Sequence, residues 1–160
     1  MKNFIARTIT GILFVAAVVV SFLDPVAMIA LFCLVTGLTV WEFTGLVNRR
    51  DDVSVNRFIS TVAGCYFFLA MAGYACGMTP PTVFVPYLVT ILYLLVSELY
   101  AKQPDPIHDW AYTMMSQLYV VLPFSLLNIL AFRVSAEGMT FTSVLPLSVF
   151  VFLWINDTGA

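Results

Sequence analysis

Three acidic residues lie inside long apolar stretches of the sequence, where a charged side chain is costly and often functional. Glu42 and Glu98 each lie near the end of an apolar run, and Asp157 follows Asn156 at the end of the last run. Carboxylate oxygens are the ligands that Mg²⁺ prefers, and the ion often binds phosphate oxygens at the same time. If the three carboxylates meet at one level of a membrane, they could hold a divalent cation beside a phosphorylated substrate.

The same acids also have a simpler interpretation. A carboxylate about one turn from a helix end can reach interfacial water or pair with a nearby basic side chain. The case for function is stronger for Asp157, because Asn156-Asp157-Thr158-Gly159 is a polar, turn-forming segment directly after a very apolar run. Glu42 and Glu98 have no such segment beside them.

The remaining polar residues indicate structure more than chemistry. His108 lies beside Asp105 and Asp109 in a polar stretch, which favours a solvated histidine over a metal ligand. Gln117 and Asn128 are expected to hydrogen-bond to neighbouring helices. The sequence contains no nucleophile elbow, Walker loop, zinc-protease motif or glycine-rich phosphate fingerprint.

Six apolar runs must position these residues. Of the 160 residues, 61% are hydrophobic and only 10% are charged, whereas about 25% are charged in a typical soluble domain. A spanning segment needs about 20 apolar residues and must be helical, because lipid offers no partner to an unpaired peptide group. We therefore predict an all-α, polytopic integral membrane protein of about six transmembrane helices, over residues 8–23, 26–47, 58–76, 83–101, 110–132 and from 141 onward.

The basic residues predict a cytoplasmic N-terminus. With that orientation the outside segments carry only Arg133, and the inside segments carry Lys2, Arg7, Arg49, Arg50, Arg57 and Lys102. The segment after the first run, Asp24-Pro25-Val26, lacks a small-x-small cleavage site, so we read the run as an uncleaved helix and not as a secretory signal. This topology brings the three carboxylates to one level, just inside the cytoplasmic face.

Net charge and cysteine usage exclude other classes. The net charge of −2, with no basic cluster larger than Arg49-Arg50, argues against a nucleic-acid partner. Three cysteines without metal-ligand spacing are read as small residues buried in the membrane: Cys33, Cys65 and Cys76.

The C-terminal residues resemble a known family. Trp154-Ile155-Asn156-Asp157, followed by Thr158-Gly159-Ala160, resembles the central motif of the phosphatidate cytidylyltransferases (CDP-diacylglycerol synthases), in which Trp-x-x-Asp closes a transmembrane helix. Arg7-Thr8-Ile9-Thr10-Gly11 is similar to the opening of the family's first helix, and Trp41-Glu42-Phe43 to an acidic-aromatic element that ends its second. The family's later Ser-Pro-Lys-Lys segment and C-terminal signature are not in this sequence, so we expect residues 1–160 to be an N-terminal transmembrane portion without the C-terminal catalytic part, and inactive alone.

The resemblance implies an enzyme that transfers CMP from CTP to phosphatidate, giving CDP-diacylglycerol and diphosphate with Mg²⁺ or another divalent cation. It implies a catalytic and metal-binding role for Asp157, substrate binding by Asn156 and Arg7, and a supporting role for Glu42. It also implies a multi-pass protein of the cytoplasmic (inner) membrane, which could form a homo-oligomer.

Two other functions remain open. The carboxylates could line the path of an ion- or proton-coupled transporter or channel, although such a path favours acids spread across the membrane depth. The chain could also belong to another CTP-using lipid enzyme.

Overall fold

Most of the chain is helical. The computed structural model describes residues 2–101, 105–136 and 138–159, with the backbone alone for residues 2–7 and 158. Its helical elements are α1 (Lys2–Ser21), α2 (Pro25–Val47), α3 (Arg57–Ala75), the 3₁₀ turn η1 (Pro81–Phe84), α4 (Val85–Tyr100), α5 (Pro106–Met115), the π-helical turn η2 (Ser116–Val121), α6 (Leu122–Ala131) and α7 (Val144–Gly159). Each of the six apolar runs forms a helix, so the all-α prediction is confirmed in its main part.

Polar caps decide where three of these helices begin. The side chain of Asp24 accepts a hydrogen bond from the Ala27 N–H at 2.8 Å, directly before Pro25 begins α2. Asn56 caps α3 and Asp105 caps α5 in the same way. Such a cap satisfies backbone N–H groups that have no partner within the helix. At these three breaks the polar residues therefore cap the next helix, in addition to separating the apolar runs.

The chain is an integral membrane protein. Four helices are long and apolar enough to cross a bilayer: Pro25–Val47, Arg57–Ala75, Pro81–Tyr100 and Pro106–Ala131. The apolar segments in the first and last helices, Thr8–Ser21 and Val144–Asp157, are shorter. Of the six spans that we predicted, the structure thus supports four by length.

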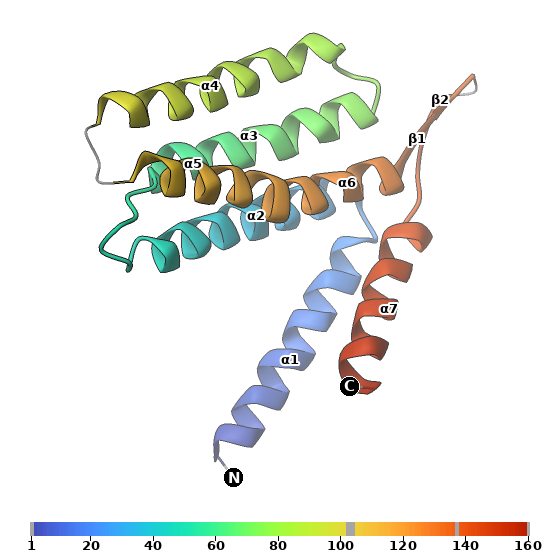
Figure 1. The fold of residues 1–160 in the computed structure, drawn as a ribbon. Coiled ribbons are helices and arrows are strands. Elements are labelled where there is room, and N and C mark those ends of the chain that lie inside the picture. The colour runs from blue at the N-terminus through green and yellow to red at the C-terminus, as the bar shows by residue number, and fades with distance from the viewer. Residues whose placement is uncertain (1, 102–104, 137, 160) are drawn as a thin grey trace.

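The four long helices lie side by side, with α3 packed against α2, α4 and α6 (Figure 1). At one end of this bundle, α1 and α7 diverge from it together (Figure 1). Aromatic contacts join the two groups, because Phe150 of α7 lies 6.0 Å from Phe22 and 5.5 Å from Phe32 between ring centroids. The main cluster of buried apolar residues, which includes Phe22 and Phe32, therefore lies at the junction of the two groups, and α1 and α7 project away from it.

Two features differ from the prediction. The segment 133–140, expected as a plain loop, contains an antiparallel hairpin of β1 (Phe132–Ser135) and β2 (Gly138–Phe141), with Gly138 at φ 121°. Pro123, near the start of α6, is preceded by the π-helical turn η2, which the sequence did not predict. Since proline cannot donate a backbone hydrogen bond, a local change in bonding pattern before it accommodates the missing donor.

Candidate functional site

The motif at the end of α7 is helical and exposed. Asn156 and Asp157 lie in the last turns of α7, which continues to Gly159, so the turn that we predicted at this point is wrong. Both side chains are exposed, while Trp154 is half-buried and packs on Phe150 with ring centroids 6.1 Å apart. The aromatic residue thus anchors the helix end to the core, and the two polar residues point outward from it.

Glu42 lies near the end of α2, in a pocket of about 560 Å³ that it shares with Arg49 and Arg57. Among the described residues, its carboxylate oxygens form no ion pair, because none lies within 4.0 Å of a guanidinium nitrogen of Arg49 or Arg57. The simple pairing of Glu42 with Arg49 is therefore not formed. Arg7 belongs to α1, but its side chain lies outside the described residues.

The expected meeting of Glu42, Glu98 and Asp157 does not occur. Figure 1 shows α2 and α4 ending together at the end of the bundle, whereas α7 ends apart from them. The prediction assumed that helices of similar depth run parallel, and the divergence of α7 breaks that assumption. In the part of the chain that the structure describes, no group of three or more His, Cys, Asp and Glu side chains is placed to hold a metal ion.

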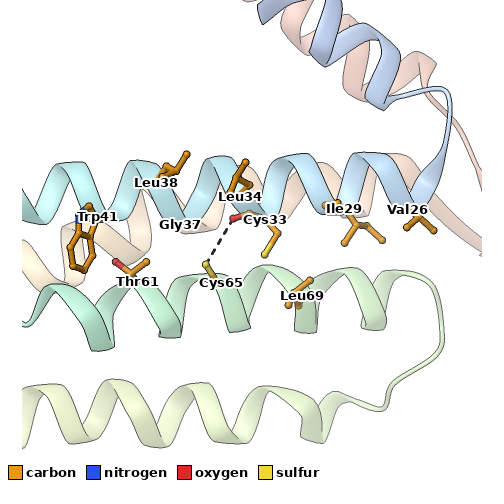
Figure 2. Close-up of a pocket in the computed structure, with 11 residues that line it drawn as sticks. Val26, Ile29, Cys33, Leu34, Gly37, Leu38, Trp41, Thr61, Cys65 and Leu69 are labelled. Atoms are coloured by element: carbon orange, nitrogen blue, oxygen red, sulfur yellow. Dashed lines mark hydrogen bonds between the residues drawn. The ribbon is translucent and has the colours of Figure 1, made fainter.

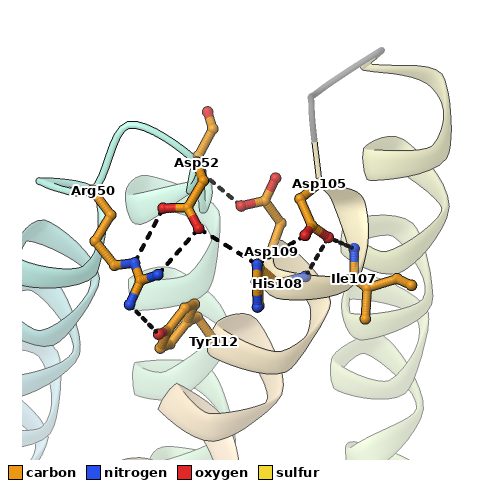
Figure 3. Close-up of polar contacts among 8 residues, drawn as sticks. Arg50, Asp52, Asp105, Ile107, His108, Asp109 and Tyr112 are labelled. Carbon is orange, nitrogen blue, oxygen red and sulfur yellow. Dashed lines mark hydrogen bonds and ion pairs between the residues drawn. The ribbon is translucent and has the colours of Figure 1, made fainter.

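A polar network instead joins the loop after α2 to the start of α5 (Figure 3). Arg50 donates from Nε and Nη2 to the two carboxylate oxygens of Asp52, both at 3.1 Å, and from Nη1 to the Tyr112 hydroxyl at 3.4 Å. His108 Nδ1 lies 2.9 Å from Asp105 Oδ2 and 3.5 Å from Asp52 Oδ2. The bidentate contact with Arg50 holds the pKa of the Asp52 carboxyl below its usual range.

Below this exposed layer lies a buried acid. Asp109 is fully buried; its Oδ1 accepts the Ser54 N–H at 2.6 Å, while its Oδ2 has no partner among the described residues. Glu98 of α4 is also buried, at 7% exposed, and interacts electrostatically with Asp109. Asp109 therefore fastens the α2–α3 loop to α5, and this is a structural role.

Sequence reasoning missed Asp109, but a signal was present. Four buried polar residues recur at helical spacing, which is the signal for Asp109: they are Asp109, Thr113, Ser116 and Gln117.

Gln117 donates to the Ser60 carbonyl at 3.1 Å and accepts from the Tyr87 hydroxyl at 3.4 Å, so it links three helices as expected. Asn128 donates only within its own helix, to Ser125, so the expected bond to a neighbour is not found among the described residues. This polar stripe faces the interior of the bundle.

Comparison with known proteins adds a family to this geometry. A model described as the cytidylyltransferase family matches residues 5–160. No curated protein and no solved structure matches the chain. The match includes α7 and its exposed Asn156-Asp157 pair, which the geometry alone leaves without a partner in the described part of the chain.

Proposed function

The chain belongs to the cytidylyltransferase family, and from this premise we propose that the intact membrane protein transfers the cytidylyl group of CTP to phosphatidate. A phosphate oxygen of the lipid attacks the α-phosphorus of CTP, and the bond from that phosphorus to the bridging oxygen breaks. The products are CDP-diacylglycerol and diphosphate. The observation that carries the proposal is the family match over residues 5–160, together with the Trp154-to-Asp157 motif at the end of an apolar helix.

The fold suits a reaction between a lipid and a soluble nucleotide. Four long apolar helices hold the protein in the bilayer, where a lipid phosphate lies at headgroup depth. Asn156 and Asp157 are exposed at the end of α7. We propose that this helix end lies at the membrane surface, where the lipid phosphate and the triphosphate can meet.

Among the described residues, Asp157 is the side chain that we propose as a catalytic residue and as one ligand of a divalent cation. Its carboxylate has the oxygen chemistry that Mg²⁺ requires, but one carboxylate does not complete a coordination shell. The cation would neutralise charge on the triphosphate and on the departing diphosphate. We further propose that Asn156 and Arg7 contact substrate phosphate, and that Glu42 has a supporting role away from the reacting groups.

The test uses the intact protein in bilayers, with phosphatidate and CTP. Label on the α-phosphate of CTP should enter the lipid phase, label on the γ-phosphate should not, and diphosphate should be released only when a divalent cation is present. A kinase that used CTP would show the opposite pattern. Failure of α-label to enter lipid would overturn the proposed reaction.

Asp157→Asn tests the residue itself. The change keeps the size of the side chain and removes the charge that attracts the cation, so turnover should fall by about two orders of magnitude or more. Asp51→Asn is the control, because Asp51 is an exposed acid in the α2–α3 loop. An unchanged rate, with an unchanged dependence on Mg²⁺ concentration, would leave Asp157 without a catalytic role.

A further inference from the structure

A long apolar groove runs between α2 and α3 on the surface of the bundle. It has a volume of about 820 Å³ and is lined by Val26, Ile29, Ala30, Cys33, Leu34, Gly37, Leu38 and Trp41 of α2 and by Thr61, Cys65 and Leu69 of α3. Figure 2 shows Cys33 and Cys65 facing each other across it; the Cys65 thiol donates to the Cys33 carbonyl at 3.9 Å. From Val26 to Trp41 the α2 side extends about 22 Å at 1.5 Å per residue. This exceeds the roughly 15 Å depth of one leaflet's hydrocarbon, so an extended acyl chain fits along it.

The groove leads directly into the charged pocket at the end of α2. Leu38 and Trp41 line both spaces, and the second also contains Glu42, Arg49 and Arg57. The apolar groove between α2 and α3 therefore ends beside two guanidinium groups at the end of the bundle. With one carboxylate present, the pocket has a net positive charge.

Arg57 is held at this junction with bonding capacity to spare. Its Nη2 donates to the Trp41 carbonyl at 2.9 Å, and its Cζ lies 4.1 Å from the centroid of the Trp41 ring. Its Nε is buried and has no acceptor in the described part of the chain. Gly45 leaves the room for this guanidinium, because a Cβ at that position would lie 2.6 Å from Nη2. A phosphate oxygen is the kind of acceptor that a guanidinium binds best.

We infer that the α2–α3 groove binds one anionic phospholipid of the bilayer, with an acyl chain along Val26–Trp41 and the headgroup phosphate at Arg57 and Arg49. The apolar length and the positive end together match an amphipathic anion, and neither feature alone would. The charged end of the groove lies at the end of α2, and α7 ends apart from it (Figure 1). The inference rests on the apolar lining and the two guanidinium groups, and it does not use the proposed reaction.

The test uses the intact protein in nanodiscs that contain phosphatidylglycerol or phosphatidylcholine with the same photoreactive diazirine acyl chain. Adducts are mapped by mass spectrometry of peptides from α2 and α3. Phosphatidylglycerol should label groove residues more than phosphatidylcholine does. Loss of one guanidinium should lower that preference roughly fivefold, since a basic side chain near the surface attracts anionic lipid by about 1 kcal/mol.

The headgroup variants are Arg57→Gln, Arg49→Gln and Gly45→Ala. The third keeps both charges but displaces the Arg57 guanidinium, which is the flexible end of its side chain and can move at little expense in stability. Arg50→Gln is the matched control. Arg50 follows Arg49 in the sequence, but it is paired with Asp52 and does not line the pocket. All three variants should reduce the phosphatidylglycerol preference, and the control should not.

The groove variants are Ala30→Phe and, as control, Ala27→Phe. Both alanines are exposed on α2, but only Ala30 lines the groove. Ala30→Phe should reduce labelling by both lipids, with thermal stability close to that of Ala27→Phe. Equal labelling by the two lipids, an equal effect of Arg50→Gln, or no adduct on groove residues would each overturn the inference. The last of these would mean that no bilayer lipid occupies the groove.

Discussion

Asp52 shows how an exposed charge can depend mainly on one partner, here Arg50. Because Arg50 lowers the pKa of its carboxyl in the folded protein, Asp52 contributes stability above its unfolded pKa of about 3.9. That contribution is lost as the pH falls through the lower folded value. Asp52→Asn should therefore reduce the melting temperature slightly at pH 7, and the difference from the native protein should shrink as the pH falls below about 4 and vanish once the pH is below the folded pKa of Asp52.

The measurement is a pair of melting curves across pH in detergent. Asp51→Asn is the comparison, since the Asp51 side chain makes no ion pair or hydrogen bond within the described residues. A difference between Asp52→Asn and native protein that persists unchanged at acid pH would show that the network does not act through this ionisation.

For single residues, the sequence predicted which polar side chains are unusual within apolar runs, but not which of them lie close together. The exposed position of Asp157 at a helix end agrees with its sequence context, while its catalytic role stays a prediction. The meeting of Glu42 and Glu98 with Asp157 was wrong, because distance from a helix end gives depth only when helices run parallel. The buried partner of the Ser54 N–H is Asp109, which reads in sequence as one more acid in a polar stretch.

Close contact between α3 and the π-helical turn depends on Gly64. A Cβ at this position would lie 2.7 Å from Val121 Cγ2 and 3.4 Å from Val40 Cγ2. Small residues allow helices in membranes to approach closely and gain packing contacts. Gly64→Ala should therefore lower the free energy of unfolding by about 1–3 kcal/mol, since buried Val121 is β-branched and cannot easily move aside.

Two further variants make this prediction specific. Combining Gly64→Ala with Val121→Ala should give less destabilisation than the sum of the single changes, because the second change removes the atom that clashes. Gly11→Ala is the control, as a Cβ there would meet nothing within 4 Å. Strict additivity in thermal or denaturant unfolding would contradict the proposed contact.

Elements were easier to predict than their interruptions. Apolar runs bounded by Pro25, Asn56 and Asp105 identified the helices, since caps and proline mark helix starts directly in the sequence. The hairpin was missed because its strands are only four residues each, too short for a clear alternating pattern. The π-helical turn was missed because it changes which backbone groups bond, with little change in composition.

The orientation of the helices in the membrane is a prediction about the whole molecule. The α2–α3 loop and the α3–α4 connection lie at opposite ends of the bundle (Figure 1), and the distribution of basic residues predicts that the α2–α3 loop is cytoplasmic. In a variant lacking Cys33, Cys65 and Cys76, Asp51→Cys should react with a membrane-impermeant maleimide only from the cytoplasmic side. Met78→Cys, at a residue that is 79% exposed, should react only from outside.

Inside-out and right-side-out vesicles allow each face to be labelled separately. The reverse pattern would overturn the cytoplasmic N-terminus and would place Arg49 and Arg57 at the outer surface. Labelling of both positions from one side would show that α3 does not cross the membrane.

The π-helical turn also gives this chain one place where its length can change. Each π-type bond encloses one more residue than an α-type bond, so η2 takes up one residue more than a continuous α-helix would need to hold the same rotation of α6 relative to α5. Removing one residue from Ser116–Val121 would therefore allow a continuous α-helix with α6 in nearly its present rotation. Ser125 and Asn128, both fully buried, would keep facing the interior of the bundle. A single-codon deletion is thus absorbed more easily at η2 than a single-codon insertion, which would rotate every later side chain by about 100°.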